Sequence, residues 1–229
     1  MSEGFDVTKK LNVTWDVDDV LLPSGALTIE YYNAAHGTSL TPDDWYSLDD
    51  LEKWGVDPDN GMLARTRVSE ILSSVPFMDT IGTTVGSGAV VEFIDTVGTQ
   101  AAVTGRPDFL QSATIQTLSK LYGGHFHDDN VYFTDHLKQT SRSMTKLEVV
   151  KSLHATDHVD DHLDHVLPIG RAGVAVALYG RYKYNEIRDE DLPATVTRVY
   201  DMDALLEYFQ FRNSSFASGK PAYISERAL

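Results

Sequence analysis

VTWDVDDVLL, residues 13–22, is the stretch from which the fold of this chain can be inferred. A short apolar segment leads into carboxylates at positions 16, 18 and 19, and the chain then turns apolar again. Two carboxylates on alternate residues at the end of a buried strand cannot both stay ionised without a partner. A hard cation such as Mg²⁺ would be such a partner, and one carboxylate could then attack phosphorus. Taken alone, the stretch could equally be a strand followed by a solvated acidic turn.

The composition indicates a globular protein with a proper hydrophobic core. The chain has 229 residues, 42% of them hydrophobic, which suits one sizeable domain or a core domain with a smaller insertion. It contains no cysteine, which excludes disulfides, thiolate catalysis and cysteine-based zinc sites. No N-terminal stretch resembles a signal peptide and no apolar run reaches membrane-spanning length, so we expect a cytoplasmic protein that does not enter the membrane.

The formal net charge of −15 limits the partners of the protein. Long nucleic acids need basic patches, so we do not expect the chain to bind them. A small phosphorylated substrate remains compatible with this charge if a metal and a few cations gather at the site. For the oligomeric state, the expectation is a monomer or a homodimer.

The hydrophobic pattern predicts alternating strands and helices outside one interrupted region. Strands are expected over 11–15, 100–103, 130–133, 158–159, 173–178 and 195–200. Helices are expected over 26–36, from 41, and over 60–74, 88–97, 109–122, 146–153 and 202–209. Such alternation predicts a parallel sheet with right-handed crossovers, and therefore a Rossmann-like three-layer α/β/α core.

Residues 23–84 interrupt this alternation, because they show helical patterns and no convincing strand. We therefore expect a core formed by residues 1–22 and 85–210 and a small helical cap formed by residues 23–84. Residues 211–229 are polar and are expected to form an irregular C-terminal tail.

Polar groups follow several of the predicted strands where each strand ends. Asp16 and Asp18 follow the first strand, Thr104-Gly105-Arg106-Pro107 ends the next, and Asp160-Asp161 closes a later one. Lys146 opens the helix before that acidic pair. In an open parallel sheet the working residues lie beyond the carboxyl ends of the strands, so these groups are predicted to meet there.

This order of groups resembles the four motifs of the haloacid dehalogenase-like phosphatase superfamily. Asp16-Val17-Asp18-Asp19-Val20 is similar to its Asp-x-Asp-x-Thr/Val motif, and Thr104 to its strand-ending Thr or Ser. Lys146 matches its lysine, and Asp160-Asp161 its acidic pair. The resemblance covers about residues 11–210. Two departures stand out: Asp19 occupies a position that is often Gly, and the strand before Asp160 is mostly polar.

The resemblance implies phosphoester chemistry with Mg²⁺ as the cofactor. Asp16 resembles the nucleophile that forms an aspartyl-phosphate, and Asp18 the general acid and base. Mg²⁺ would be held by Asp16, the backbone carbonyl of Asp18 and Asp161, with Asp160 orienting this metal site from behind.

The remaining motif residues would supply positive charge and hydrogen bonds to the phosphate. Lys146 would hold Asp16 and the phosphate oxygens, and the Thr104 hydroxyl and the Gly105 amide would donate to those oxygens. Arg106 is open between two partners, the phosphate or sugar of the substrate and a carboxylate of the cap.

Softer motifs resemble one branch of that superfamily, the C1-capped 5′-nucleotidases and 5′(3′)-deoxyribonucleotidases. The stretches 32–41, 103–107 and 181–185 are similar to segments of that branch. Nucleoside 5′-monophosphates are therefore the leading substrate class. Cap aromatics could stack on the base or simply pack the cap; the candidates are Tyr31, Trp45, Tyr46 and Trp54.

Rival functions remain open at this point. The same site could serve a sugar phosphate or another small metabolite, or an idle relative could only bind a phosphorylated ligand. The cluster between His154 and His165 could form a transition-metal site, since His158 and His162 have the spacing of two ligands on a helix. A polar loop beside the Mg²⁺ site is the alternative for that cluster, and the pair at His125 and His127 is expected to lie in a solvated loop.

Overall fold

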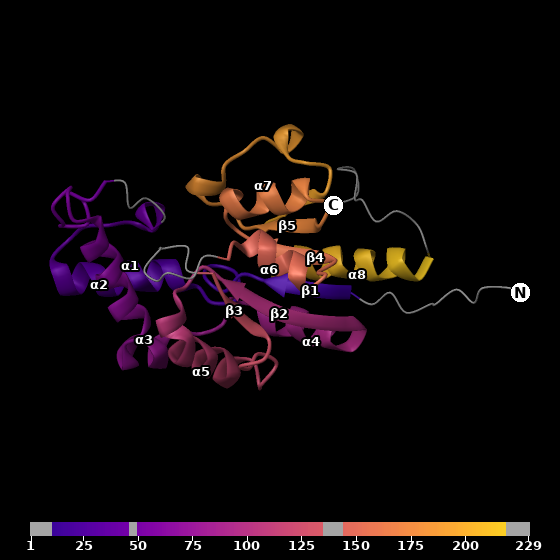
Figure 1. Cartoon of the computed structure of the whole chain (residues 1–229), viewed down its shortest axis with the longest axis horizontal. Helices are drawn as coiled ribbons and strands as arrows, with labels where there is room; N and C mark the ends of the chain where they lie inside the picture. Colours follow the sequence, from indigo (N-terminus) through magenta and orange to yellow (C-terminus); the bar gives the residue numbers. More distant parts are fainter. Residues whose placement is uncertain (1–10, 46–49, 135–143, 219–229) are drawn as a thin grey trace, which may run out of the picture.

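The computed structural model describes residues 11–45, 50–134 and 144–218. In this part of the chain, parallel strands form a six-stranded sheet in the order β3-β2-β1-β4-β5-β6 (Figure 1). The strands are β1 (Leu11–Trp15), β2 (Gly98–Thr104), β3 (Val131–Phe133), β4 (Asp157–Asp160), β5 (Ala175–Tyr179) and β6 (Val196–Val199). The first strand of the chain is therefore central, between β2 and β4.

Helices cover both faces of the sheet. On one face α4 (Ser87–Val97) packs against α8 (Met202–Ser218), and the Ser87 hydroxyl bonds to the hydroxyl of Tyr122, next to the end of α5 (Gln111–Leu121). On the other face α6 (Lys146–Ser152) packs against α7 (Leu163–Arg171). This arrangement confirms the three-layer α/β core expected from the alternating pattern.

The strands bury both of their faces, as parallel strands do. Along β5, Ala177 and Tyr179 join the large apolar cluster, whereas Val176 and Leu178 join a second cluster with residues of α6 and α7. The sheet thus separates two hydrophobic cores, and its carboxyl edge is left for polar groups.

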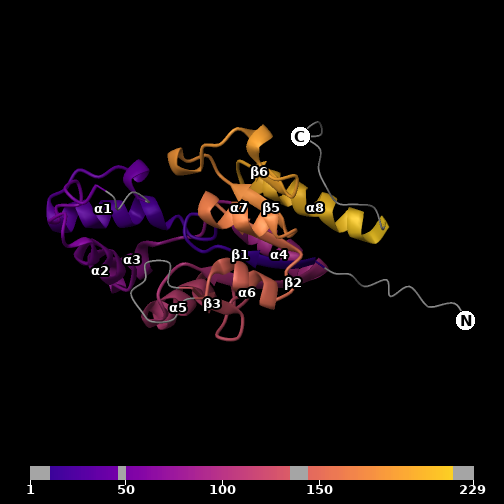
Figure 2. The same cartoon turned by 45° about the horizontal axis from the view of Figure 1, so that its top comes forward.

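The region after β1 is the expected helical insert. It contains α1 (Ser24–His36), a 3-10 turn (Pro42–Asp44), α2 (Gly61–Leu72) and α3 (Val75–Thr80), and the described residues of 23–84 contain no strand. These helices lie together at one end of the molecule, away from the middle of the sheet (Figures 1 and 2). Gly37 ends α1 in the left-handed conformation, with φ 67°, as its C′ position predicts.

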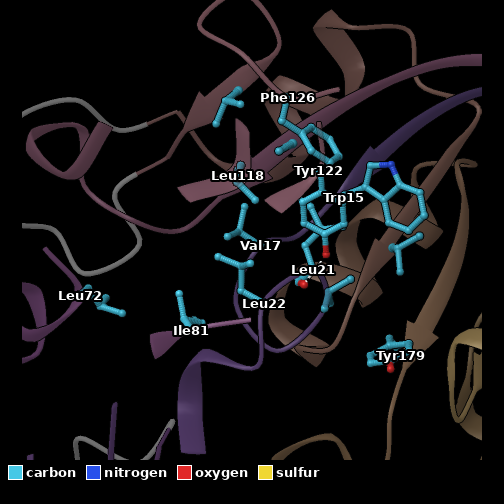
Figure 3. Close-up of a cluster of buried hydrophobic side chains, with 14 of the residues drawn as sticks. Trp15, Val17, Leu21, Leu22, Leu72, Ile81, Leu118, Tyr122, Phe126 and Tyr179 are labelled. Carbon is cyan, nitrogen blue, oxygen red and sulfur yellow. Dashed lines mark hydrogen bonds between the residues drawn. The ribbon is translucent and has the colours of Figure 1, made fainter. Parts of the chain in front are cut away.

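An apolar seam joins this cap to the core. Leu72 and Ile81 from the cap side and Leu21, Leu22 and Tyr122 from the core side belong to one buried cluster (Figure 3). The backbone oxygen of Leu21 accepts hydrogen bonds from Thr84 N at 2.9 Å and from the Tyr122 hydroxyl at 2.5 Å. The base of the cap is therefore fixed to the core at the point where the chain enters and leaves it.

Three expectations for the elements were wrong. The helix predicted from Thr41 is a single 3-10 turn, although Thr41 and Asp44 do form its capping box. Residues 211–218, expected in an irregular tail, continue α8, because Arg212 and Ser215 lie buried one and two turns after Tyr208. Residues 219–229 lie outside the described part of the chain.

The third correction concerns the cluster of histidines and acids expected to form a polar loop. Part of it begins α7, and the His162 side chain caps this helix by accepting a hydrogen bond from Asp164 N at 3.2 Å.

Among the described residues, no helix is both long and apolar enough to span a membrane.

Candidate active site

Three carboxylates meet at the carboxyl edge of the two central strands. Asp16 directly follows β1. Asp160 ends β4 and Asp161 follows it, and β4 pairs with β1 through Trp15 and Val159. Asp16 is 4% exposed and the other two are fully buried. One oxygen of each lies within 4.8 Å of those of the other two, and among the described residues this is the group found close enough to share a metal ion.

Lys146 supplies the nearest positive charge. Its Nζ lies 2.7 Å from Asp16 Oδ2 and 2.7 Å from Asp160 Oδ2, and its side chain is 2% exposed. Lys146 is the first residue of α6, whose start is fixed by a capping box between Thr145 and Glu148. Burial alone would lower the pKa of Lys146, but the two carboxylates raise it, so the lysine is charged.

One lysine does not neutralise three buried carboxylates. Burial, together with repulsion from Asp160 and Asp18, raises the pKa of Asp16 to about 8. Burial and repulsion from Asp16 raise the pKa of Asp161 well above its usual value. Asp161 Oδ1 is buried without a hydrogen-bond partner, whereas Oδ2 accepts from the Tyr184 hydroxyl at 2.5 Å. An oxygen that lacks a partner, among hard carboxylate donors, fits a cation such as Mg²⁺.

Asp160 is engaged differently from Asp161. Its Oδ1 accepts a hydrogen bond from His162 N at 2.8 Å, and its Oδ2 accepts from Lys146 and lies 3.1 Å from His158 Nε2. Burial would raise the pKa of Asp160, but the charge of Lys146 and the hydrogen bond with His158 help to hold it well below its usual value. The structure therefore ties Asp160 to its protein neighbours, which suits an orienting role better than direct metal binding.

Arg106 pairs with a carboxylate of the core rather than of the cap, and its contact with a substrate stays a prediction. Its guanidinium pairs with Asp18, and it also donates to Thr114 Oγ1 at 3.1 Å and to Ser24 Oγ at 3.3 Å. The arginine is 4% exposed, so these donors are engaged inside the protein. Burial would raise the pKa of Asp18, but the charge and hydrogen bonds of Arg106 hold it below its usual value.

Thr104 and Gly105 lie where the motif predicts them. Thr104 ends β2, the neighbour of β1, and its hydroxyl accepts a hydrogen bond from Arg106 N at 3.1 Å. Gly105 is half-buried in the turn that follows. This turn therefore approaches the same sheet edge as Asp16 from the strand next to it.

The turn after the two acids explains why glycine suits the position of Asp19. Asp19 has φ 57°, the left-handed region, which glycine enters freely and aspartate tolerates better than most residues. Its Oδ1 accepts a hydrogen bond from Gly25 N at 2.9 Å, at the start of α1. Burial raises the pKa of Asp19 to about 7. The extra acid is thus used to hold the first cap helix.

A loop after β5 also reaches this site. Besides the bond from Tyr184, Asn185 Nδ2 donates to the backbone oxygens of Asp161 and Tyr179 at 3.0 and 3.2 Å. The sequence singled out residues 181–185 without giving Tyr184 a role. The signals were its place after a strand of the same parallel sheet and the resemblance of its stretch to the nucleotidases.

The cap aromatics are divided by the structure. Trp54 is 1% exposed and packs edge-on against Tyr32, whose hydroxyl donates to Trp54 O at 2.8 Å, so it forms the cap core. Tyr31 and Trp45 are partly buried against the same core, and Tyr46 lies outside the described residues. Asn33, from the stretch 32–41, holds the following turn through Leu40 N and O at 2.9 Å each.

The histidines do not form a metal centre among the described residues. Both ring nitrogens of His158 face protein partners, Thr14 and Asp160, and His162 uses Nδ1 to cap α7. His127 is exposed in a loop, as expected. The expected alternative of a transition-metal site at His158 and His162 is therefore wrong for this structure.

Comparison with known proteins identifies the fold of this chain through solved structures. The sequence matches no family model and no curated relative. A predicted phosphatase from Clostridium acetobutylicum is similar in structure, with a TM-score of 0.62 and 16% identity over 89% of this chain and 99% of that one.

Two further structures agree. A haloacid dehalogenase-like family hydrolase from Streptococcus pneumoniae has a TM-score of 0.61 and 12% identity over 88% and 99% of the two chains. A predicted phosphoglycolate phosphatase from Haemophilus somnus has a TM-score of 0.58 and 15% identity over 90% and 100%. This chain therefore has the fold of the haloacid dehalogenase-like hydrolases, with a helical cap inserted after its first strand.

Proposed function

We propose that the protein is a Mg²⁺-dependent phosphomonoesterase that acts on small phosphorylated metabolites through an aspartyl-phosphate on Asp16. The observation that carries this proposal is the salt bridge from Lys146 to both Asp16 and Asp160, beside the partnerless Asp161 Oδ1. Asp16 is a buried carboxylate that contacts a lysine and lies beside carboxylates suited to bind a cation. Positive charge from the lysine and the cation would offset the repulsion between Asp16 and a phosphate dianion.

Asp16 is the nucleophile in this proposal. An Asp16 oxygen forms a bond to phosphorus while the bond from phosphorus to the alkoxide of the substrate breaks. The Lys146 ammonium, the Thr104 hydroxyl and the Gly105 amide stabilise the phosphate oxygens. Asp16 and Asp161, with the backbone carbonyl of Asp18, would hold Mg²⁺, which when bound supplies charge that offsets the repulsion between carboxylate and phosphate.

Asp18 moves the protons. It gives a proton to the leaving alkoxide, and in the second half of the reaction it takes a proton from the water that attacks the phosphorus of the aspartyl-phosphate. The salt bridge from Arg106 favours the ionised form of Asp18, which suits the second half. A phosphate dianion beside Asp18 raises its proton affinity, which supports the first half.

The leading substrate class is nucleoside 5′-monophosphates, because the stretches 32–41, 103–107 and 181–185 resemble the corresponding nucleotidases. Neighbours with this fold include proteins described as phosphatases, one of them as a predicted phosphoglycolate phosphatase. Sugar phosphates and other small metabolites form the alternative substrate class, and an idle relative that only binds a phosphorylated ligand is the alternative without turnover.

Phosphate release with Mg²⁺ tests the proposal. The panel contains nucleoside monophosphates, sugar phosphates and phosphoglycolate, with EDTA and the variant Asp16→Asn beside the wild type. Asp129→Asn is the matched control, because Asp129 is 97% exposed and lies outside the site. We expect turnover of one nucleotide group that is lost in EDTA and falls by about 10⁴-fold or more in Asp16→Asn.

The outcomes separate the alternatives. Turnover confined to sugar phosphates or phosphoglycolate would keep the mechanism and discard the nucleotides. Activity that survives Asp16→Asn would overturn the mechanism. Binding of phosphorylated ligands without turnover by the wild type would point to the idle relative.

A further inference from the structure

A histidine that the proposed mechanism does not use lies inside the sheet behind the candidate nucleophile. His158 is the second residue of β4 and faces Thr14 of β1 across the strand pairing. Both residues are fully buried. Their chain neighbours Trp15 and Val159 belong to the large apolar cluster, so Thr14 and His158 point to the other face, toward the layer of α6 and α7. Apolar packing alone does not account for a polar pair in this place.

His158 is connected to the nucleophile by an unbroken chain of short contacts. Thr14 Oγ1 lies 2.9 Å from Nδ1 of His158, and Nε2 lies 3.1 Å from Asp160 Oδ2. The same oxygen of Asp160 accepts from Lys146 Nζ at 2.7 Å. Lys146 Nζ in turn lies 2.7 Å from Asp16 Oδ2. The imidazole is therefore two residues removed from the attacking carboxylate.

The partners of the ring fix which nitrogen carries the proton. Burial lowers the pKa of His158, so the neutral ring carries a single N–H. If that proton were on Nδ1, the lone pair of Nε2 would face the ionised oxygen of Asp160, which is unfavourable in a buried site. The proton is therefore on Nε2, and Nε2–H donates to Asp160. The Thr14 hydroxyl, which also lies 3.2 Å from Asp157 O, donates to the nearer Nδ1.

The Nε2–H of His158 affects how Lys146 is shared between Asp160 and Asp16. Asp160 Oδ1 is held by His162 N, and Oδ2 receives both the imidazole N–H and the ammonium. Without the imidazole N–H, Oδ2 has one donor left and the carboxylate gains freedom to turn about its last side-chain bond. Lys146 can then pair with Asp160 more fully and leave Asp16.

We propose that His158 is a positioning residue, which through Asp160 keeps the Lys146 ammonium on Asp16 Oδ2. This inference rests on the proposed function, since it assigns Lys146 its catalytic place. Groups that orient a reacting constellation from behind typically contribute about 10- to 100-fold. The effect is expected in kcat, because His158 touches neither substrate nor solvent.

A pair of substitutions at His158 distinguishes the effect of losing the Nε2–H donor from the effect of losing the volume of the ring. His158→Gln can place an amide N–H near the position of Nε2, whereas His158→Asn can reach only toward the position of Nδ1. We expect kcat to fall about 10- to 100-fold in His158→Asn, to recover to within a few-fold in His158→Gln, and KM to stay unchanged in both. Equal loss of kcat in the two variants, or none in either, would overturn the proposal.

A readout without turnover keeps this test independent of the proposed function. In the wild type, ¹⁵N NMR of the imidazole should show a neutral ring protonated on Nε2, and a ring protonated on Nδ1 would overturn the proposal. The Lys146 Nζ resonance should shift in His158→Asn and stay near its wild-type position in His158→Gln. An Nζ resonance that both variants leave unchanged would also overturn it.

The two failures can therefore be told apart. If no substrate is turned over, the proposed function fails, while the ring proton and the Nζ resonance still decide the positioning role. If His158→Asn does not fold, His158→Gln carries the test alone, and a loss of kcat of about 10-fold or more in this variant would overturn the proposal.

Discussion

Arg106 holds Asp18 through two nitrogens of its guanidinium: Nη2 donates to Oδ1 at 2.7 Å, and Nε donates to Oδ2 at 3.1 Å. The two acids that follow β1 thus have separate cations, since Asp16 is paired with Lys146. Arg106 comes from the turn after β2 and Lys146 from the start of α6. Different parts of the chain therefore set the environments of the proposed nucleophile and of the proposed acid and base.

Arg106→Lys tests the contact that two guanidinium nitrogens of Arg106 make with Asp18. Lysine keeps the charge but not the planar pair of donors, so Asp18 loses its fixed orientation. We expect kcat for phosphate release to fall by about 10-fold or more, with a smaller change in KM. Arg171→Lys is the control, because Arg171 is exposed at the end of α7. A wild-type kcat in Arg106→Lys would show that the orientation of Asp18 does not depend on the paired guanidinium donors.

Lys146→Met tests the bridging cation. The substitution removes the positive charge between Asp16 and Asp160 and keeps most of the side-chain volume. We expect kcat to fall by about 10²- to 10³-fold, as when one donor to a charged transition state is lost. Lys151→Met in the same helix is the matched control, because Lys151 is exposed. Comparable losses in the two variants would assign the effect to α6 as a whole.

The stability of the metal-free protein should fall as the pH rises. Asp16 and Asp161 have raised pKa values in the folded state, about 8 for Asp16, whereas both ionise near 3.8 when unfolded. Between these values the folded state binds more protons than the unfolded state, so their contribution is present at low pH and is lost toward pH 8. In EDTA, Tm should therefore decrease from pH 5.5 to pH 8 in a thermal unfolding series.

Mg²⁺ should reverse this trend, because it binds the ionised carboxylates. We expect the gain in Tm on adding Mg²⁺ to increase with pH, where each 1 kcal/mol corresponds to about 2–4 °C. Asp161→Asn should lose the gain and Asp129→Asn should keep it. A gain that does not depend on pH would contradict the raised pKa values.

A buried ion pair at the opposite end of β4 from Asp160 should govern stability rather than turnover. At the amino end of β4, Asp157 accepts from Arg212 Nε at 2.6 Å and Nη2 at 3.0 Å, and from the Tyr208 hydroxyl at 2.9 Å. Arg212→Met leaves this carboxylate buried without its cation, which should cost about 3–5 kcal/mol.

Thermal and chemical unfolding measure that loss. Arg171→Met provides the comparison, because Arg171 is exposed at the end of α7. At a temperature where both variants are folded, kcat should equal that of the wild type. A Tm for Arg212→Met within 1 °C of that of Arg171→Met would show that the pair adds no net stability.

The position of the site could be predicted from the sequence because each of its groups ends or opens an element of a parallel sheet. Asp16 follows β1, Thr104 ends β2 and Asp160 ends β4, and the carboxyl ends of parallel strands share one edge. The contact of Lys146 with Asp16 agrees with its predicted place near that carboxylate. The chemical roles of these residues are not tested by their geometry and stay predictions.

The partners of individual side chains could not be predicted in the same way. The pairing of Arg106 with Asp18 joins residues 88 positions apart and depends on the turn that follows each strand. His158 and Tyr184 lie in stretches whose polar composition resembles loops, and their contacts exist only once the strands are in register.

The helix α7 was missed for a local reason. Its first turn is rich in histidine and aspartate, and Pro168 lies inside it, so the stretch resembles a loop. A signal was nevertheless present, since Leu163, Val166 and Ile169 recur at helical spacing.

The central place of β1 has a consequence for how the chain must fold during synthesis. Thr14 and its partner His158 are 144 residues apart, so at about 5–20 residues per second the ribosome needs roughly 7–30 s to supply β4 after β1. During that interval one backbone edge of an apolar strand has no native neighbour and is open to aggregation or to chaperones. The strand that is buried at the centre of the finished sheet is therefore the one that waits with an unpaired edge during synthesis.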